Sequence, residues 1–245
     1  MSWDPGAYLA FDDHRARPFD DLLARVRAAQ PRRVVDLGCG PGHLTAELAA
    51  RWPNALVEAL DSSPEMVAQA RGRGVAAVLG DIAEWRPAPD ADVVVCNAVL
   101  QWVPGHDELL RRWISALPPG GEFALQVPGN QESPAHVLAR ELHPAVKGSQ
   151  SVLEPREYAE LITGVAASVA DVWETTYLHR LEGADPVLDW ISSTTLRPVR
   201  EALDDHEWTV FRAELAPRLR AAYPRAADGG TWFPFRRIFA VARRG

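Results

Sequence analysis

Short apolar runs alternate along the first half of the chain with stretches in which apolar residues recur every three or four positions. The runs predict buried strands and the stretches predict helices. Strands are expected at 33–37, 56–60, 75–79, 92–96 and 122–127, and helices at 18–29, 43–51, 64–73 and 106–117. Buried strands that alternate with helices imply a parallel sheet covered on both faces by right-handed crossovers.

The last third of the chain has a different pattern. Residues 166–181 and 231–243 alternate over a length that predicts two long strands, and 185–192 and 204–223 between them have helical spacing. We therefore expect an α/β fold: a Rossmann-like doubly wound sheet of about seven strands, mostly parallel with an antiparallel last strand. A helical cap at about 183–229 is expected between the last two strands. All 245 residues are expected to form one domain, of which 31–130 is the ligand-binding half.

Composition narrows the range of partners. The net charge of −7 argues against a nucleic-acid partner, because duplex binding needs a basic face. Cys39 and Cys96 have no Cys or His partners at metal-ligand spacing, so we expect reduced thiols and no metal site. The polar start and the lack of an apolar run of transmembrane length predict no membrane contact. We expect a cytoplasmic monomer that acts on a small molecule.

A glycine-rich turn follows the first predicted strand. Asp36 is followed by Gly38, Gly40 and Gly42, and a helical pattern starts at His43. Glycine allows positive φ angles and a close approach of the backbone to a ligand, and the helix behind it presents unpaired N–H groups. A dinucleotide-binding turn would need its third glycine at position 43, which is a histidine. The spacing resembles motif I of the class I S-adenosylmethionine-dependent methyltransferases, although a tight turn without a ligand would also fit.

Polar residues follow the next strands at the edge where ligands bind in parallel sheets. Asp61, about twenty residues after the glycines, can accept hydrogen bonds from both hydroxyls of a ribose. Asp81 can accept from an adenine amino group while the N–H of Ile82 donates to the ring. Asn97 lies where the transferred methyl group is expected. Met66 fits either an adenine contact or the core.

The pattern at the start of the helix predicted at 64–73 is a capping signal. Ser63 is expected to be the N-cap, and Pro64 the first helical residue. This capping role explains Ser63 without requiring a ligand, and it leaves Asp61 free for one.

The motifs together resemble a class I methyltransferase throughout; they are Val34–Gly42, Leu60–Met66, Gly80–Ile82, Asn97–Trp102 and Leu117–Gly121. Outer segments resemble the trans-aconitate 2-methyltransferase family; they are Trp3–Pro5, Tyr8–Phe11, Arg15–Pro18, Val172–Tyr177, Asp189–Ile191 and Phe235–Arg237. The resemblance implies S-adenosylmethionine as cofactor and S-adenosylhomocysteine as product. The cofactor-binding residues are then expected to be Asp36, Gly38, Gly40, Asp61, Ser62, Met66, Asp81, Ile82 and Asn97.

The resemblance also implies methylation of one carboxylate of a small tricarboxylic acid, most directly trans-aconitate. A carboxylate with a pKa of about 4 is already a nucleophile at neutral pH, so we expect no general base and no catalytic residue beyond those that position the reactants. Donors for the remaining carboxylates are expected among Arg15, Arg17, Trp102, Asn130, Tyr177, His179 and Arg197.

Three alternatives stay open. The connector Glu141–Leu153 is shorter than is usual in the family, so another small acid is one candidate. A natural-product hydroxyl is a second, and a phenol would need a base such as His43, His106 or His179. A non-catalytic S-adenosylmethionine-binding protein is the third.

Overall fold

The computed structural model describes residues 12–146, 152–165 and 167–245. The segments Trp3–Pro5 and Tyr8–Phe11 lie outside these residues. The elements up to the fifth strand are α2 (Asp12–Leu23), β1 (Arg33–Leu37), α3 (His43–Arg51), β2 (Leu56–Asp61), α4 (Pro64–Gly72), β3 (Ala77–Leu79), η1 (Ile82–Glu84), β4 (Ala91–Asn97), η2 (Leu100–Trp102), α5 (His106–Ala116) and β5 (Glu122–Pro128). The remaining ones are α6 (Pro134–Leu142), α7 (Pro155–Thr163), β6 (Ala167–Leu181), α8 (Pro186–Ser192), α9 (Arg197–Ala202), α10 (Asp205–Ala222) and β7 (Thr231–Arg244).

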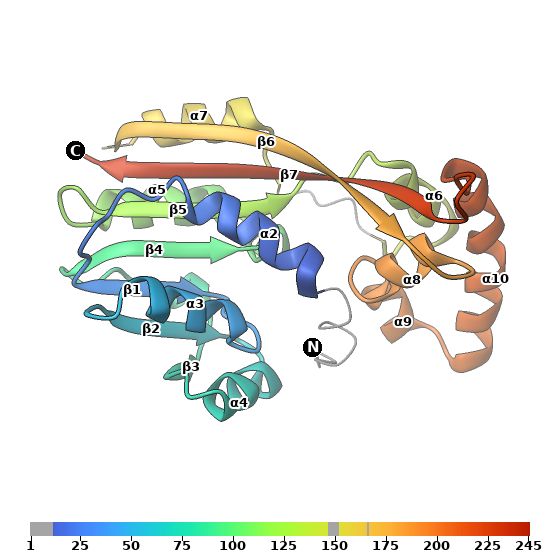
Figure 1. Ribbon diagram of the computed structural model, residues 1–245, viewed down its shortest axis with the longest axis horizontal. Helices are drawn as coiled ribbons and strands as arrows, with labels where there is room; N and C mark the ends of the chain where they lie inside the picture. Colours follow the sequence, from blue (N-terminus) through green and yellow to red (C-terminus); the bar gives the residue numbers. More distant parts are fainter. Residues whose placement is uncertain (1–11, 147–151, 166) are drawn as a thin grey trace. The chain divides into compact units, whose positions relative to one another are not determined.

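The strands form one seven-stranded sheet in the order β3-β2-β1-β4-β5-β7-β6 (Figure 1). The first five strands pair in parallel with their neighbours. The chain moves outward from β1 to β3 and then returns to place β4 on the other side of β1. Ligands bind outside the carboxyl ends of the strands at such a reversal of strand order, so the residues that follow β1 and β4 are those to inspect for a site.

β7 runs antiparallel to β5. The N–H of Gly129, just after β5, donates to the Arg236 carbonyl at 3.0 Å, whereas the N–H of Arg244 donates to the Gly121 carbonyl, just before β5, at 2.9 Å. Partners in β7 therefore move backward as the chain advances along β5. The arrow of β7 also points opposite to those of β5 and β6 in Figure 1. The predicted fold class, a mostly parallel sheet with antiparallel closing strands, is confirmed.

β4 lies at the centre of the sheet and is covered on both faces. Val93, Val94, Val95 and Cys96 are each 0% exposed. Such a continuous apolar run is typical of a parallel strand with helices on both sides, since alternate side chains point to opposite faces. This central strand therefore holds Asn97 in a fixed position at its carboxyl end.

The chain divides into two compact units. Unit 1 comprises residues 1–128, 151–174 and 238–245, and unit 2 comprises 129–150 and 175–237. The five parallel strands and the expected 31–128 part of the ligand-binding half belong to unit 1. The expected cap at about 183–229 falls within unit 2, together with α6 and parts of the two long strands. The single domain expected from the sequence stays a prediction.

The first helix differs from its prediction. It was expected at 18–29 with Pro18 at its start, whereas α2 spans Asp12–Leu23 with Pro18 in its interior. Proline fixes φ at a value that a helix accepts, so it can sit inside a helix at the cost of one backbone hydrogen bond. Three further helices, α6, α7 and α9, had no counterpart in the predicted elements.

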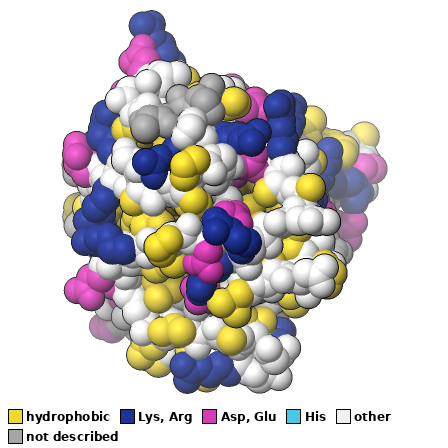
Figure 2. Space-filling model, turned by 90° about the vertical axis from the view of Figure 1, so that its left-hand side faces the viewer, with side chains coloured by type: hydrophobic (Ala, Val, Ile, Leu, Met, Phe, Trp, Pro, Cys, Tyr) yellow, Lys and Arg dark blue, Asp and Glu magenta, His cyan; other side chains and the backbone are white. Residues whose placement is uncertain are grey.

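Ion pairs lie at the amino ends of the central strands. Arg33 pairs with Asp90 at 2.8 Å and also contacts Glu58, and Arg32 pairs with Asp92 at 2.7 Å. Figure 2 views the molecule from the side on which β1 and β4 begin, and it shows basic and acidic side chains next to each other.

Across the described ranges, no helix is both long enough and apolar enough to span a bilayer.

Candidate functional site

The turn between β1 and α3 contains three glycines with left-handed backbone angles. Gly38, Gly40 and Gly42 have φ values of 80°, 54° and 81°. A residue with a side chain would be strained at these angles, so the backbone conformation favours glycine. A Cβ atom added to Gly38 would lie 2.2 Å from Val99 Cγ2, whereas one added to Gly40 would meet no atom within 4 Å. The turn therefore packs tightly at Gly38 and faces open space at Gly40.

Asp61, the last residue of β2, holds this turn through the backbone. Its Oδ2 accepts from the N–H of Gly40 at 2.8 Å, and its Oδ1 accepts from the N–H of Ser63 at 2.8 Å. The N–H of Gly38 donates to the Leu60 carbonyl at 2.7 Å. Each carboxylate oxygen can accept a second hydrogen bond, so Asp61 is oriented by the protein and can still receive a diol.

Asp36 joins β1 to α3. It is 3% exposed, and its Oδ2 accepts a hydrogen bond from Thr45 Oγ1 at 2.6 Å. Burial raises the pKa of Asp36 to about 6, the Thr45 hydrogen bond opposes this rise, and the negative charge of Asp61 adds to it. The contact to Thr45 gives Asp36 a structural role, and a contact with the cofactor stays a prediction.

The start of α4 follows Asp61 directly. Ser63 is the N-cap, with its Oγ accepting from the N–H of Met66 at 3.3 Å, and Pro64 is the first helical residue, so this capping prediction is confirmed. Ser62 is exposed, and Met66 is 3% exposed. The burial of Met66 fits its interpretation as a core residue, and its predicted contact with adenine stays a prediction.

The residues after β3 also have backbone partners. Asp81 Oδ1 accepts from the N–H of Ala83 at 2.8 Å and so caps η1, while the rest of the exposed side chain faces solvent. Ile82 is 5% exposed and belongs to the hydrophobic core of unit 1. Asp81 is thereby held with one carboxylate oxygen available to a ligand.

A strained residue follows β4. Ala98 has a φ of 56°, which is rare for a residue with a side chain. Its N–H donates to the Gln126 carbonyl at 2.8 Å, and its carbonyl accepts from Gln101 Nε2 at 2.7 Å. Strained backbone of this kind gathers at functional sites because the surroundings must hold it. Next to it, Asn97 Oδ1 is buried and has no hydrogen-bond partner among the described residues.

These features fit the S-adenosylmethionine that the sequence predicts. A buried acceptor without a partner costs free energy, and the Asn97 oxygen would find donors in an adenosyl or amino-acid group. Asp61 and Asp81 offer acceptors at the two neighbouring strand ends. Gly40 leaves open space where any side chain would project. All of these residues belong to unit 1.

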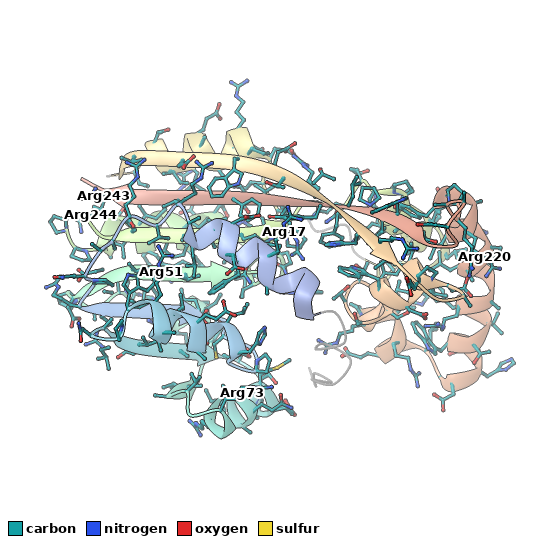
Figure 3. All side chains as sticks on the ribbon, viewed as in Figure 1. Arg17, Arg51, Arg73, Arg220, Arg243 and Arg244 are labelled. Carbon is teal, nitrogen blue, oxygen red and sulfur yellow. The ribbon has the colours of Figure 1, made fainter. Side chains whose placement is uncertain are left out.

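Three predicted substrate residues belong to unit 1. Arg17 is exposed on α2 (Figure 3), and the side chain of Arg15 on the same helix lies outside the described part of the structure. Trp102 ends η2 and is 42% exposed, which is unusual for so large an apolar side chain. An exposed tryptophan just after the end of β4 is available for a ligand contact.

Two other predicted substrate residues lie in an aromatic cluster of unit 2. Tyr177 and His179 are 4% and 5% exposed, and His179 stacks on Trp190 with ring centroids 4.8 Å apart. Phe235 lies 6.0 Å from the His179 ring. The cluster also includes Arg237, which is 6% exposed and lies with its guanidinium carbon 4.5 Å from the centroid of the Phe235 ring.

Arg237 was not among the predicted residues, although a signal for it exists. Phe233, Phe235 and Arg237 are two apart in β7 and all buried, so the strand period places Arg237 on the same face as the two rings. Arg197, which was predicted, forms an ion pair with Glu201 at 3.3 Å in the same helix. Asn130 is buried, and its amide bonds to the backbone of Arg236.

The histidines considered as bases are placed differently from one another. His106 Nε2 lies 2.9 Å from the Tyr158 hydroxyl inside the core of unit 1, and burial lowers the pKa of His106 below its ordinary value. His43 is the first residue of α3, and His179 lies in the aromatic cluster. His106 is therefore tied to a structural partner.

The remaining candidate groups are the two cysteine thiols and the side chains that could bind a metal ion. Cys39 and Cys96 are free and buried, and burial raises the pKa of both thiols above the ordinary value. Within the described ranges, no group of three or more His, Cys, Asp or Glu side chains is placed to hold a metal ion.

Comparisons with known proteins match the chain to methyltransferases. The family described as "Methyltransferase domain" matches residues 11–212. The chain is 56% identical to trans-aconitate 2-methyltransferase of Rhodococcus jostii, over 98% of this chain and 99% of that protein. It is 58% identical to trans-aconitate 2-methyltransferase of Mycobacterium sp. (strain KMS), over 99% of this chain and 100% of that protein.

A solved structure shows the same fold. Haemonchus contortus phosphoethanolamine N-methyltransferase 2, in complex with phosphomonomethylethanolamine and S-adenosylhomocysteine, is similar with a TM-score of 0.58 and 16% identity. The match covers 94% of this chain and 53% of that one. This likeness concerns the fold alone.

Replacing Asp61 with alanine is expected to weaken S-adenosylhomocysteine binding by tenfold or more. The change removes an acceptor for two backbone N–H groups and for the ribose, and a hydrogen bond to a charged group is worth roughly 1.5–3 kcal/mol. Calorimetric titration of the variant measures the loss. Glu214→Ala, an exposed acid on α10, controls for the loss of one negative charge. Equal affinity in wild type and Asp61→Ala would contradict this assignment.

Replacing Asp36 with asparagine is expected to change how stability depends on pH. Because the pKa of Asp36 in the folded protein, about 6, lies above that of the unfolded chain, the wild type loses stability as the pH rises from about 4 to about 6. The asparagine side chain does not titrate, so the Asp36→Asn variant should gain about 3 kcal/mol relative to wild type across this window. Urea unfolding at pH 4 and pH 7 measures the difference.

The side-chain hydrogen bond to Asp36 provides a directional control. Since the Thr45 hydroxyl lowers the pKa of Asp36 in the folded protein, Thr45→Val should move the upper end of the window to higher pH and leave its lower end unchanged. A stability difference between wild type and Asp36→Asn that stays constant from pH 4 to 7 would show that folding does not raise the pKa of Asp36.

Proposed function

We propose that the chain, which belongs to the trans-aconitate 2-methyltransferase family of S-adenosylmethionine-dependent methyltransferases, methylates one carboxylate of trans-aconitate. The products are the monomethyl ester and S-adenosylhomocysteine. The observation that carries the proposal is the sequence identity of 56% and 58% with the two relatives of that name, over 98% and 99% of this chain. The glycine turn and the acidic strand ends of unit 1 support the cofactor part of it.

Methyl transfer to a carboxylate needs no acid or base catalyst. When bound, S-adenosylmethionine supplies a methyl group on a positively charged sulfur, which a carboxylate oxygen can accept without proton transfer. A carboxylate is ionised at neutral pH, so the protein need not remove a proton from it. Its residues instead position the two reactants and keep water away.

We infer that the cofactor residues work from four strand ends, those of β1, β2, β3 and β4. Gly38 and Gly40 give the ligand access to the backbone, Asp61 holds the ribose hydroxyls, and Asp81 with the N–H of Ile82 recognises the adenine. Asn97 offers the acceptor that lacks a partner among the described residues. Asp36 supports the turn from within through Thr45. Ser62 and Met66 stay predicted contacts.

The donors for the substrate carboxylates are a separate part of the proposal. Arg15, Arg17, Trp102, Asn130, Tyr177, His179 and Arg197 stay predictions. We add Arg237, because a guanidinium buried to 6% exposure against an aromatic ring offers a desolvated positive charge for a carboxylate. It shares the Phe235 ring with His179, one of the predicted residues.

The other acceptors are weighed by what they require. A phenol needs a base, and of the three histidines His106 is occupied by Tyr158 in the core. Another small acid needs the same donors as trans-aconitate and differs only in their spacing. The cytoplasmic location, the monomeric state and the lack of a nucleic-acid partner stay predictions from the sequence.

A substrate panel tests the proposed acceptor. Purified enzyme with S-adenosylmethionine is expected to convert trans-aconitate to a monomethyl ester with a higher kcat/KM than other di- and tricarboxylic acids. Mass spectrometry of the ester and release of S-adenosylhomocysteine are the readouts. Asp61→Ala serves as the low-affinity control. S-adenosylhomocysteine release with a phenol and with none of the acids would contradict carboxylate methylation.

Arginine-to-lysine variants test which guanidinium holds a carboxylate. Lysine keeps the charge and loses the two-pronged geometry, so the KM for trans-aconitate should rise about tenfold at Arg237 or at one of Arg15, Arg17 and Arg197. The affinity for S-adenosylhomocysteine should not change. Arg218→Lys, which alters an exposed pair with Glu214 at 2.8 Å, is the matched control. If all four variants equal this control, the acid is held by other residues.

A further inference from the structure

One arginine outside the predicted set contacts the glycine turn directly. Arg73, in the turn that follows α4, donates from Nη1 to the carbonyl oxygen of Pro41 at 2.8 Å. Pro41 stands between Gly40 and Gly42. Arg73 is among the residues labelled in Figure 3. The contact joins the turn after β1 to the C-terminal end of α4, the helix that follows β2.

The Pro41 carbonyl needs a partner from outside α3. Gly42 is the N-cap of α3, and its own carbonyl accepts the first bond of the helix, from the N–H of Ala46 at 3.1 Å. The carbonyl one residue earlier therefore lies before the helical ladder. The Arg73 guanidinium, a strong charged donor, fills this position.

The flanking glycines make this contact matter for the shape of the turn. Gly40 and Gly42 have φ values of 54° and 81°, and glycine moves between such states and others at little cost. The ring of Pro41 fixes its own φ, but the orientation of its carbonyl also depends on its ψ and on the φ of Gly42, which side-chain sterics do little to fix. A donor anchored on a neighbouring helix selects one orientation of the Pro41 carbonyl.

The segment from Asp61 to Arg73 holds the turn at three points. Asp61 binds the N–H of Gly40 at 2.8 Å, and Arg73 binds the carbonyl of Pro41. At Gly42 an added Cβ would lie 2.8 Å from the Cβ of Ala70, which is itself fully buried. The turn is therefore held by Asp61, the proposed ribose-binding acid just before α4, and by Arg73, the basic residue just after it.

We propose that Arg73 is a positioning residue for S-adenosylmethionine. By fixing the Pro41 carbonyl it keeps the Gly40 N–H on the Asp61 carboxylate, which in turn keeps Asp61 oriented for the ribose. Without Arg73 the turn samples more conformations in the free enzyme, and the cofactor must select among them on binding. This inference rests on the cofactor part of the proposed function and not on the identity of the acceptor acid.

The first test compares two arginines at the same end of α4. Arg73→Ala is expected to raise the dissociation constant of S-adenosylhomocysteine and the KM for S-adenosylmethionine about three- to tenfold, with kcat within about twofold at saturating cofactor. Arg73→Lys, which can still donate to a carbonyl, should recover part of the loss.

The matched control is Arg71→Ala. Arg71 donates from Nε to the carbonyl of Ala77, at the start of β3, at 2.9 Å, so its removal deletes the same charge and the same kind of bond at a place away from the turn. Its affinity for S-adenosylhomocysteine should stay within about twofold of wild type. Equal losses in Arg71→Ala and Arg73→Ala, or a loss of kcat without a change in affinity, would overturn the proposal.

A double-mutant cycle tests the route through Asp61. If Arg73 acts by keeping Gly40 on the Asp61 carboxylate, the combined variant Arg73→Ala with Asp61→Ala should lose less affinity than the product of the two single losses. Fully multiplicative losses would overturn this route. The binding assay contains no acceptor, so a failure of trans-aconitate as substrate leaves this test intact, whereas a wild type that binds no S-adenosylhomocysteine would refute the proposed function itself.

Discussion

The hydrogen bonds from Gly40 and Ser63 to the Asp61 carboxylate are the contacts on which the proposed cofactor site depends. They join the ends of β1 and β2 through one side chain, because Asp61 ends one strand and Gly40 belongs to the turn after the other. The left-handed angles of the glycines let the N–H of Gly40 reach this carboxylate. An acid at this position therefore organises its own surroundings before any ligand arrives, and that reduces the ordering cost of binding.

The division of labour between cofactor and protein explains which residues the site contains. An activated methyl group and an ionised acid need no proton shuttle. The residues of the site therefore have to position the reactants, match their charges and exclude water. Two buried titratable groups of unit 1 accordingly have structural partners: Asp36 has Thr45, and His106 has Tyr158. In unit 2, the guanidinium of Arg237 lies 4.5 Å from the centroid of the Phe235 ring, and the His179 ring lies 6.0 Å from it. The buried phenyl ring therefore lies next to a positive charge.

Local signals made much of the fold predictable. The bounds of β1 and α3 match their predictions because a buried run, a glycine turn and a helical period meet there without overlap. α6 and α7 were missed although Ser133-Pro134 and Glu154-Pro155, which are signals for a helix start, stand at their beginnings. The location of Asp61, Asp81 and Asn97 at the carboxyl ends of strands could be predicted, because each follows a largely apolar run in the sequence. Their contacts with the cofactor stay predictions. Arg73 could not, because its partner is 32 residues away and is a backbone carbonyl, which no pattern of side chains reveals.

Asn130 fixes the position of β7 through its side-chain amide. Its Nδ2 donates to the Arg236 carbonyl at 2.9 Å and its Oδ1 accepts the Arg236 N–H at 2.8 Å, so the side-chain amide takes the place of a strand partner for β7. These bonds fix the register of β7 at this point. A shift of one residue would turn Phe235 and Arg237 to the opposite face and bring their more exposed neighbours inward. Asn130, which is expected to contact the substrate, thus also fixes the face of β7 on which the buried Arg237 lies.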